Sequence, residues 1–395
     1  MGKKVLIILA LFLALIAGSA MTQVLTDEEE LGKAIFFDKS LSIKNNQSCA
    51  SCHAPNVGWT GPVPGINKKG SVYFGSVRTR FGNRKPPAVA YAGDSPPLYY
   101  DADEEVWIGG MFWDGRATGW VLGDPLAEQA QGPFLNPLEQ ALPDASYVVN
   151  RVCNSKYSSL FKTVYGEDIC SSVPEAYNRI AQAIAAYERS SEVDQFSSKY
   201  DAYMAGEVEL TPKESRGLQL FRGEKAMCAD CHVEPLFTDF TYDNLGLPRN
   251  PQNPFYFEPE WNPEGLAWVD SGLGGFLKSA GFGEDFYLEA WGKMKVPTLR
   301  NVDKRPGNGF VKAFGHNGYF KSLEGIVHFY NTRDVKPVCP DEFTTEKDAI
   351  AQGCWPRPEV IENVNMDELG NLELTPAEED DIVAFLKTLS DGYRP

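Results

Sequence analysis

The chain has 395 residues, of which 43% are apolar, 23% charged and 12% aromatic. This length excludes a single small domain. The apolar content excludes a disordered chain, because the chain has enough apolar surface to bury on folding. With 54 acidic and 37 basic side chains, the formal net charge is −17 at pH 7. Nucleic acid is therefore not an expected partner, whereas a basic or neutral one is favoured.

The N-terminus has the pattern of a secretory signal peptide. Two lysines are followed by an apolar run over residues 5–17 and then by small residues up to Ala20. We expect cleavage after Ala20, so that residues 1–20 are a signal peptide and the mature protein is periplasmic, with no stable membrane insertion. The alternative is an uncleaved anchor, but the run is shorter than the ~20 residues that span a bilayer.

Four segments are predicted to be helical because their apolar residues recur at helical spacing. Residues 31–37 precede a cysteine motif, and residues 174–204 predict a long helix followed by a shorter one. Residues 211–221 precede a second, similar cysteine motif and begin with the Thr-Pro pair of a capped helix, which makes a weak internal repeat. Residues 375–389 predict another capped helix with acids in its first turn.

Long stretches rich in Gly, Pro and aromatic residues lie between these helices, notably residues 54–110 and 245–292. Loops of this length are usually functional or wrapped around something. We expect both stretches to be irregular and to surround a cofactor.

Two copies of the motif Cys-x-x-Cys-His identify that cofactor as haem c. Two thiols at this spacing add across the two vinyl groups of a haem, and the adjacent His places an imidazole under the iron. Zinc would lack ligands at either copy, and a thioredoxin-like pair would need a βαβ context. The sequence predicts two covalently attached haem c groups, with the histidines as ligands of the first and second iron: Cys49, Cys52 and His53, then Cys228, Cys231 and His232.

The other four cysteines fall into two local pairs. Cys153 lies near Cys170, and Cys339 lies near Cys354. In an oxidising compartment we expect each pair to form a disulfide that stabilises the protein by ~3 kcal/mol. Free buried thiols are the alternative.

The histidine count suggests an open first iron. Of four histidines, only His316 and His328 remain once the two haem motifs are assigned, and both lie in the C-terminal half. An imidazole from them would have to reach the first haem from the other domain. We therefore expect an open position there, where peroxide or another small ligand binds. Met111 is an alternative ligand, although its place in an aromatic run favours packing.

Several further segments resemble the bacterial di-haem cytochrome c peroxidase family over roughly residues 26–392. They are Phe112-Trp-Asp-Gly-Arg-Ala117, the run from Gln129 to Glu139, Val296-Pro-Thr-Leu-Arg-Asn-Val302, His316-Asn-Gly and Ser322-Leu-Glu324. The resemblance implies a mainly α fold with long irregular loops and two cytochrome c-like domains, whose haems face across the domain interface. We expect residues 21–205 to carry the peroxide site and the connecting helices, and residues 206–395 to carry the electron-transfer haem.

The same resemblance implies roles for three side chains. Trp113 lies between the haems as an electron relay, and Gln129 and Glu139 line the peroxide pocket. Glu139 suits this role chemically, because cleavage of a peroxide needs a group that moves a proton from the inner to the outer oxygen. Without the resemblance, a surface acid and a core tryptophan would be the ordinary interpretations.

Tyr330 is the first departure from ordinary family members, which have a Met ligand fourteen positions after the His of the His-x-Gly motif, here His316. A Tyr there resembles the MauG branch, in which the second haem carries His and Tyr and a tryptophan of a partner protein is oxidised. A thioether favours ferrous iron, whereas a phenolate favours higher oxidation states. We expect Tyr330 to ligate the second iron; the alternative is a buried aromatic, with Met294 or Met366 as ligand.

Two more departures concern the first haem and calcium. Ordinary members have a displaceable His on the first haem, and its absence here predicts an open iron without reductive activation. The family places an interdomain calcium near an Asn that follows the Arg of a Gly-x-Arg segment, but this chain has Lys85 after Arg84. A lysine could replace the ion with its own charge, so calcium is uncertain. We interpret His316 and His328 as structural or as outer partners of the haem sites.

These features predict a haem-dependent oxidoreductase that reacts with hydrogen peroxide. In the favoured hypothesis, oxidising equivalents pass through Trp113 to the second haem, and a protein substrate is oxidised at Trp or Tyr. The alternative is a cytochrome c peroxidase that reduces hydrogen peroxide to water with electrons from a small redox protein. A non-enzymatic di-haem electron carrier would need two saturated irons, against the histidine count.

Overall fold

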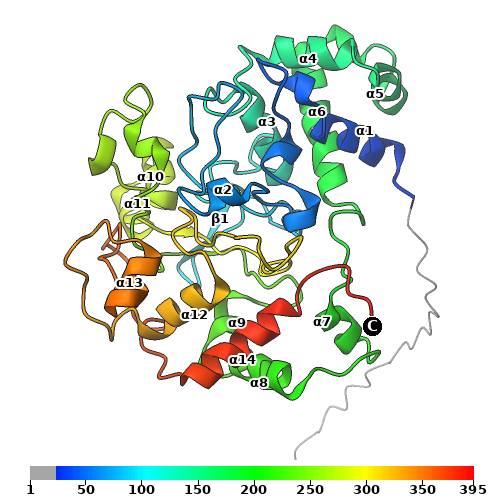
Figure 1. The fold of residues 1–395 in the computed structure, drawn as a ribbon. Coiled ribbons are helices and arrows are strands. Elements are labelled where there is room, and N and C mark those ends of the chain that lie inside the picture. The colour runs from blue at the N-terminus through cyan, green and yellow to red at the C-terminus, as the bar shows by residue number, and fades with distance from the viewer. Residues whose placement is uncertain (1–23) are drawn as a thin grey trace, which may run out of the picture.

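The computed structural model describes residues 24–395, so the predicted signal peptide lies outside the described residues. The fold is mostly helical, as expected (Figure 1). The helices of the first half are α1 (Asp27–Phe36), α2 (Pro64–Asn67), α3 (Pro125–Leu135), α4 (Ala145–Cys153), α5 (Ser158–Tyr165) and α6 (Val173–Glu188). Those of the second half are α7 (Lys199–Met204), α8 (Pro212–Arg222), α9 (Cys228–Cys231), α10 (Gly272–Ser279), α11 (Glu284–Glu289), α12 (Leu323–Thr332), α13 (Glu346–Gln352) and α14 (Pro376–Lys387).

Two small antiparallel sheets complete the regular structure. Strands β1 (Tyr99–Asp101) and β2 (Val106–Ile108) form a hairpin, and β3 (Tyr242–Asp243) pairs with β4 (Met294–Lys295). In the described part of the chain, none of the helices combines the length and the apolar character that a membrane span requires.

Threonine caps start three of the predicted helices. In each, the Thr side chain accepts from the backbone N–H of a Glu three residues later, and that Glu side chain accepts from the Thr N–H. Helix α1 begins four residues before the predicted range of 31–37, because Thr26 caps it and four acids fill its first turn. The predicted helices in 174–204, 211–221 and 375–389 are confirmed as α6 with α7, α8 and α14.

The helix before each haem motif crosses a later helix at a glycine. A Cβ on Gly32 of α1 would collide with the carbonyl of Ala183 in α6, and a Cβ on Gly217 of α8 would collide with the carbonyl of Asp381 in α14. Only glycine permits such close approach of two backbones. The weak sequence repeat thus corresponds to a repeated helix crossing.

Each crossing belongs to a separate hydrophobic core. One core contains buried residues from Leu25 to Val193, and the other contains buried residues from Tyr200 to Leu389. Figure 1 shows α1, α4, α5 and α6 together at the top and α7, α8, α12 and α14 together at the bottom. The exact domain boundary between residues 205 and 206 stays a prediction.

A third, smaller cluster joins the β1–β2 hairpin to α10 and α11. It buries Trp107 and Tyr242 together with Leu273 and Leu277 of α10. The irregular interpretation of residues 245–292 is therefore wrong for these two helices. Glycine lowers the helix propensity of α10, whose formation depends instead on this packing.

Both predicted disulfides are present. Cys153 bonds to Cys170, and Cys339 bonds to Cys354, at sequence separations of 17 and 15. The first links the end of α4 to the segment before α6, and the second flanks α13. The four cysteines of the haem motifs are free.

Candidate functional site

The first haem motif lines a cavity of about 500 Å³, counting the space that opens to solvent. Gln129 comes from α3, and Glu139 comes from the turn that follows it, so the structure brings together the two predicted peroxide-pocket residues and the motif. The residues that line this cavity include Cys49, Cys52, His53, Gln129, Glu139 and Glu188.

Both motif histidines are oriented by backbone carbonyls. His53 Nδ1 lies 3.0 Å from the carbonyl oxygen of Pro87, and His232 Nδ1 lies 3.0 Å from that of Phe237. Because a carbonyl only accepts, Nδ1 carries the proton and Nε2 is left to ligate a metal. Burial lowers the pKa of His53 to about 4 and also lowers the pKa of His232, which keeps both imidazoles neutral.

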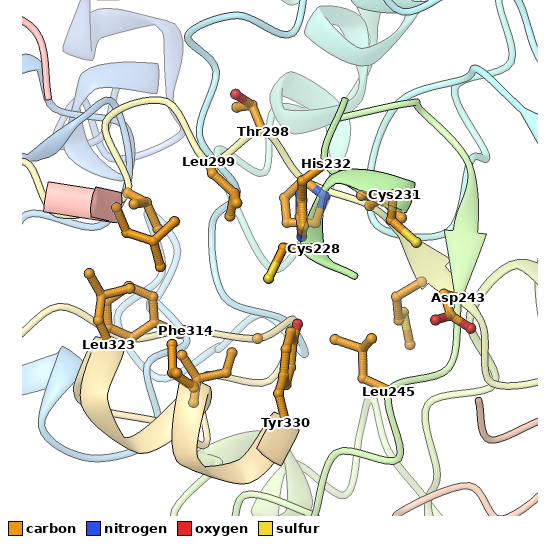
Figure 2. A pocket seen from close by; sticks show the side chains of 18 of the residues that line it. Cys228, Cys231, His232, Asp243, Leu245, Thr298, Leu299, Phe314, Leu323 and Tyr330 are labelled. Atoms are coloured by element: carbon orange, nitrogen blue, oxygen red, sulfur yellow. The ribbon is translucent and has the colours of Figure 1, made fainter. Parts of the chain in front are cut away.

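A larger cavity contains the second haem motif and occupies about 1700 Å³, counting the space that opens to solvent. His232 and Tyr330 line it from opposite sides, and Figure 2 shows the Tyr330 hydroxyl pointing across it toward His232. Tyr330 comes from α12, where it lies on the face turned to the cavity. The wall also includes Cys228, Cys231, Trp113, Met294 and His316.

The two methionine alternatives to Tyr330 differ in position. Met366 is 61% exposed and its sulfur contacts Arg333, so it does not line the cavity. Met294 is buried and does line it. Met294 therefore stays the alternative ligand. Met111 packs in the first hydrophobic core and lines neither cavity, as the packing interpretation expected.

Several buried polar atoms in the wall of the first cavity have no hydrogen-bond partner among the described residues. Within the described residues, Gln47 Oε1, Gln140 Oε1 and Glu188 Oε2 have no hydrogen-bond partner. All three residues line the cavity, and native proteins rarely leave such atoms unpaired. The free cysteines and the oriented histidines fit a covalently bound haem at each motif, and the orphaned polar atoms add support at the first. Burial raises the pKa of Glu188 to about 8. No sequence signal distinguished Glu188 from other helix acids.

Trp113 lines the cavity of the second motif and is hydrogen-bonded to a segment that contacts the first motif. Its indole nitrogen donates to the carbonyl of Lys85 at 2.8 Å, and its ring centroid lies 6.4 Å from that of His316. It lines the larger cavity, as does Pro87, whose carbonyl accepts from His53. A single short segment thus connects Trp113 to the histidine of the first motif.

The two remaining histidines have different surroundings. His316 is buried beside Trp113, with Nε2 3.9 Å from a carboxylate oxygen of Glu359, and burial lowers its pKa to about 4. His328 Nδ1 lies 3.0 Å from a carboxylate oxygen of Glu379 and lines neither cavity. These positions suit the expected outer and structural roles.

Lys85 occupies the position at which the family resemblance places a calcium-binding Asn. Its ammonium group donates to Thr60 Oγ1 at 3.3 Å and to the carbonyl of Pro86 at 3.1 Å. It also lies 5.9 Å from the centroid of the Trp113 ring. A cationic side chain here is the opposite of a calcium ligand, which must be an oxygen donor.

A second buried lysine, Lys312, lies near Lys85. Lys312 Nζ donates to the carbonyls of Val57, Asn301 and Lys304 at 2.9, 2.6 and 3.2 Å. Burial and the neighbouring Lys85 lower its pKa, while three acceptors match the three donors of an ammonium group. Within residues 24–395, no group of three or more His, Cys, Asp or Glu side chains is arranged to hold a metal ion. The residues around Lys85 do not fit a calcium site.

Comparison with known proteins identifies the family. The family model described as di-haem cytochrome c peroxidase matches residues 26–209. The chain is 34% identical to methylamine utilization protein MauG of Paracoccus denitrificans over 377 residues, which cover 92% of this chain and 89% of the relative. It is 30% identical to cytochrome c551 peroxidase of Nitrosomonas europaea over 313 residues, which cover 78% of this chain and 74% of the relative.

A solved structure of a diheme peroxidase has a similar fold. The diheme peroxidase BthA of Burkholderia thailandensis superposes with a TM-score of 0.76 at 30% identity, covering 92% of this chain and 86% of BthA. The chain belongs to the di-haem cytochrome c peroxidase family. It is a haem oxidoreductase that acts on peroxide, with two covalently bound haem c groups.

Proposed function

We propose that the protein is a periplasmic, MauG-like enzyme that takes hydrogen peroxide at the first haem site and oxidises a Trp or Tyr of a partner protein. When bound, the two haems supply the irons that react with peroxide and hold oxidising equivalents. The observation that carries this proposal is the Tyr330 hydroxyl facing His232 across the larger cavity (Figure 2).

Tyr330 determines which oxidation state of iron the second haem site favours. Burial raises the pKa of its hydroxyl, and the carboxylate of Asp243 raises it further. A phenolate here therefore needs a cation in the cavity to stabilise it. A hard, anionic oxygen favours iron in its more oxidised forms, whereas the thioether of a Met favours the ferrous form. Tyr330 thus suits a site that stores an oxidising equivalent.

Glu139 and Gln129 handle the peroxide. Burial raises the pKa of Glu139, partly offset by Arg116, so its carboxylate is more basic than an ordinary Glu. It can accept the proton of the inner peroxide oxygen and return it to the outer oxygen, which then leaves as water. Gln129 lines the same cavity and can orient the peroxide by hydrogen bonding.

Trp113 relays electrons between the two sites. Its indole is buried, hydrogen-bonded through Nε1 and held within one short segment of His53. A fixed indole between two cavities is a suitable one-electron carrier because its ring is easily oxidised and its position does not change. The partner protein supplies the electrons.

The second candidate function is removal of hydrogen peroxide with electrons from a small redox protein. The similarity to cytochrome c551 peroxidase favours it. In that case the second site must be reduced before the first reacts, and a Met ligand such as Met294 would suit it better than Tyr330.

A spectroscopic titration tests the proposal. Stoichiometric hydrogen peroxide is added to the fully oxidised holoprotein without reductant, and the absorption of both haems is followed. We expect a rapid change at both haems. If the protein reacts only after a reductant is supplied, the peroxidase alternative replaces the proposal.

Tyr330→Met provides the matched variant. We expect it to lose the change at the second haem, because a thioether no longer stabilises the oxidised site. Tyr319→Phe is the control, since Tyr319 is buried in the same core and donates to the carbonyl of Thr344, outside the cavity. An unchanged second-haem spectrum in Tyr330→Met means that Met294 or another group is the ligand.

A further inference from the structure

We propose that an exposed aromatic patch with an acidic rim is the docking surface for a partner protein with a basic face, and that electrons enter the enzyme there. The aromatic patch consists of Trp120, Val121, Phe282 and Phe286. The acidic rim consists of carboxylates on the β1–β2 turn and on α11. This inference rests on the proposed function, because it places the partner from which that function draws electrons.

Three side chains of the aromatic patch are exposed, and the partly buried Phe282 connects two of them. Trp120 is 50% exposed, Val121 is 86% exposed and Phe286 is 39% exposed. The ring centroid of Phe282 lies 6.0 Å from that of Trp120 and 6.3 Å from that of Phe286. Neighbouring exposed aromatic side chains mark interaction sites, because interface centres are enriched in Trp and Phe.

The loop that presents the patch is held in place. The carboxylate of Glu128 accepts from the backbone N–H groups of Gly119, Val121 and Leu122 at 2.6, 2.7 and 2.8 Å. The indole nitrogen of Trp120 donates to the carbonyl of Leu98 at 2.7 Å. The polar edge of the indole is thus satisfied within the protein while its apolar face is left to solvent. A partner would meet a surface that needs little ordering.

The acidic rim determines the chemistry of the partner. Residues 99–109 and 272–289 together contain seven acids and one base, Lys278. Tyr100 of β1 lies against Phe286 of α11, with ring centroids 5.1 Å apart, so the two acidic segments are neighbours at this residue. The acids are Asp101, Asp103, Glu104, Glu105, Glu284, Asp285 and Glu289. Such a rim attracts a basic protein and repels a second copy of this acidic chain.

An aromatic route leads inward from this surface. The Trp107 ring centroid lies 5.2 Å from that of Phe282 and 5.4 Å from that of Tyr100. Trp107 is buried in the same cluster as Tyr242. Figure 1 shows α10 and α11 beside β1.

The route ends beside the relay. Tyr242 donates its hydroxyl to the carbonyl of Gly109 at 2.6 Å and lies against Gly115, two residues beyond Trp113. In addition, the backbone N–H of Lys295, opposite Tyr242 in the β3–β4 sheet, donates to the carbonyl of Trp113 at 2.8 Å. The route is thus aromatic from the patch to Trp107 and its cluster partner Tyr242, and backbone contacts of Gly115 and Lys295 connect it to Trp113.

The electron balance is simple. The partner loses two electrons in two one-electron steps, each passing through Trp107 and Trp113. Together with two protons, they reduce one hydrogen peroxide to two waters. Hydrogen peroxide is the oxidant, and the reductant is the partner's reduced side chain or metal, which becomes oxidised as it loses these electrons.

Docking is tested with a basic cytochrome c as the probe partner. Its affinity for the holoprotein is measured by calorimetry at several ionic strengths. We expect the triple variant Asp103→Lys, Glu104→Lys, Glu105→Lys to bind about tenfold more weakly or worse, with a smaller salt dependence. The control is the triple variant Glu207→Lys, Glu209→Lys, Glu224→Lys. It changes the net charge by the same amount, at exposed positions outside the acidic rim.

The aromatic residues are tested separately. Trp120→Ala should weaken binding without altering folding, because the side chain is half-exposed. Trp107→Phe should leave binding unchanged but slow peroxide-driven oxidation of the ferrous cytochrome by about tenfold or more. Trp268→Phe is the control, since Trp268 packs on Phe255 outside the route.

The outcomes separate this inference from the proposed function. If the rim variant and the control bind the probe equally, or if Trp120→Ala binds as tightly as the native protein, the docking surface lies elsewhere. If Trp107→Phe oxidises the ferrous cytochrome at the native rate, the aromatic route is wrong. None of these results affects the reaction of the isolated protein with peroxide, whose failure would instead remove the proposed function.

Discussion

Trp113 and Lys85 are joined by a hydrogen bond of 2.8 Å from the indole nitrogen to the backbone carbonyl. Two residues further along the chain, the carbonyl of Pro87 accepts from Nδ1 of His53. A residue on the wall of the larger cavity is thus tied to the segment that orients the histidine of the smaller one. This connection fixes the indole relative to the segment that contacts His53.

Replacing Trp113 tests the relay. In Trp113→Phe the ring volume is largely kept, but the hydrogen bond and the easily oxidised indole are lost. We expect the first haem to react with peroxide at the native rate and the second to respond about tenfold more slowly or worse. Rapid-mixing absorption spectroscopy follows both haems. With Trp268→Phe as control, a native rate at the second haem in Trp113→Phe would contradict the relay role.

Replacing Glu139 tests the proton transfer. Only the ionised carboxylate can accept a proton from peroxide, and burial raises the pKa of Glu139. The peroxide rate should therefore rise with pH through a pKa above the ordinary value of about 4.3 for Glu. Glu139→Gln should be slower by about a hundredfold or more and should lack this rise.

The control for this prediction is Glu167→Gln, because Glu167 is highly exposed and its pair with Lys162 is long, at 3.9 Å. Its rate and pH profile should match those of the native protein. A pH profile that persists in Glu139→Gln would assign the proton transfer to another group. Glu188, on the wall of the same cavity, would then be the next residue to replace.

Sequence reasoning succeeded where the information is local. The haem motifs, the capped starts at Thr211 and Thr375 and the two disulfides each lie within one short segment. Helix α1 begins earlier than its apolar pattern predicts, because the cap at Thr26 determines its start. Helix α10 was missed because its glycines disfavour a helix until Leu273 and Leu277 are buried by residues distant in the chain.

Long-range partners were beyond the sequence. Nothing local indicates that Lys312 meets the carbonyl of Val57, 255 residues away, or that Glu188 faces the same cavity as Glu139. The resemblance to a family supplied Glu139 and Trp113 through their motifs, whereas these other contacts lie outside any motif. Their discovery required the tertiary structure.

Calcium dependence provides a third prediction. The ammonium group of Lys85 occupies the position at which the family resemblance places calcium. A calcium chelator should therefore leave the unfolding temperature of the holoprotein unchanged. Lys312→Met should lower the free energy of unfolding, because it leaves three buried carbonyls without a donor at about 1 to 3 kcal/mol each before relaxation. Thermal unfolding with and without chelator measures both effects. A drop in the unfolding temperature of the native protein on chelation would show that calcium binds after all.

The last prediction concerns Arg84, which joins two distant carboxylates. Its guanidinium makes two hydrogen bonds of 2.6 Å to Asp270 and lies 2.6 Å from an oxygen of Asp114. All three side chains are nearly buried. Burial alone raises the pKa of each carboxyl, but Arg84 outweighs it at Asp270 and lowers that pKa to about 2, while Arg84 and Arg116 together lower the pKa of Asp114 below its ordinary value. Arg84 thus stabilises contacts between residues 186 positions apart.

Arg84→Met should destabilise the holoprotein by about 3 to 5 kcal/mol at pH 7, because it leaves the buried carboxylate of Asp270 without its cation, while Asp114 keeps its pair with Arg116. An Asp whose folded pKa is depressed contributes stability above its unfolded pKa of about 3.9, and this contribution is lost as pH falls toward the folded value. The deficit of Arg84→Met should therefore shrink as pH falls from about 4 toward 2, where the native protein also loses the ionised pair. Denaturant unfolding across this range measures it. Arg179→Met is the control, because its pair with Glu175 is exposed and contributes less than about 1 kcal/mol; equal stability losses in the two variants would show that Arg84 does not hold the carboxylates in this way.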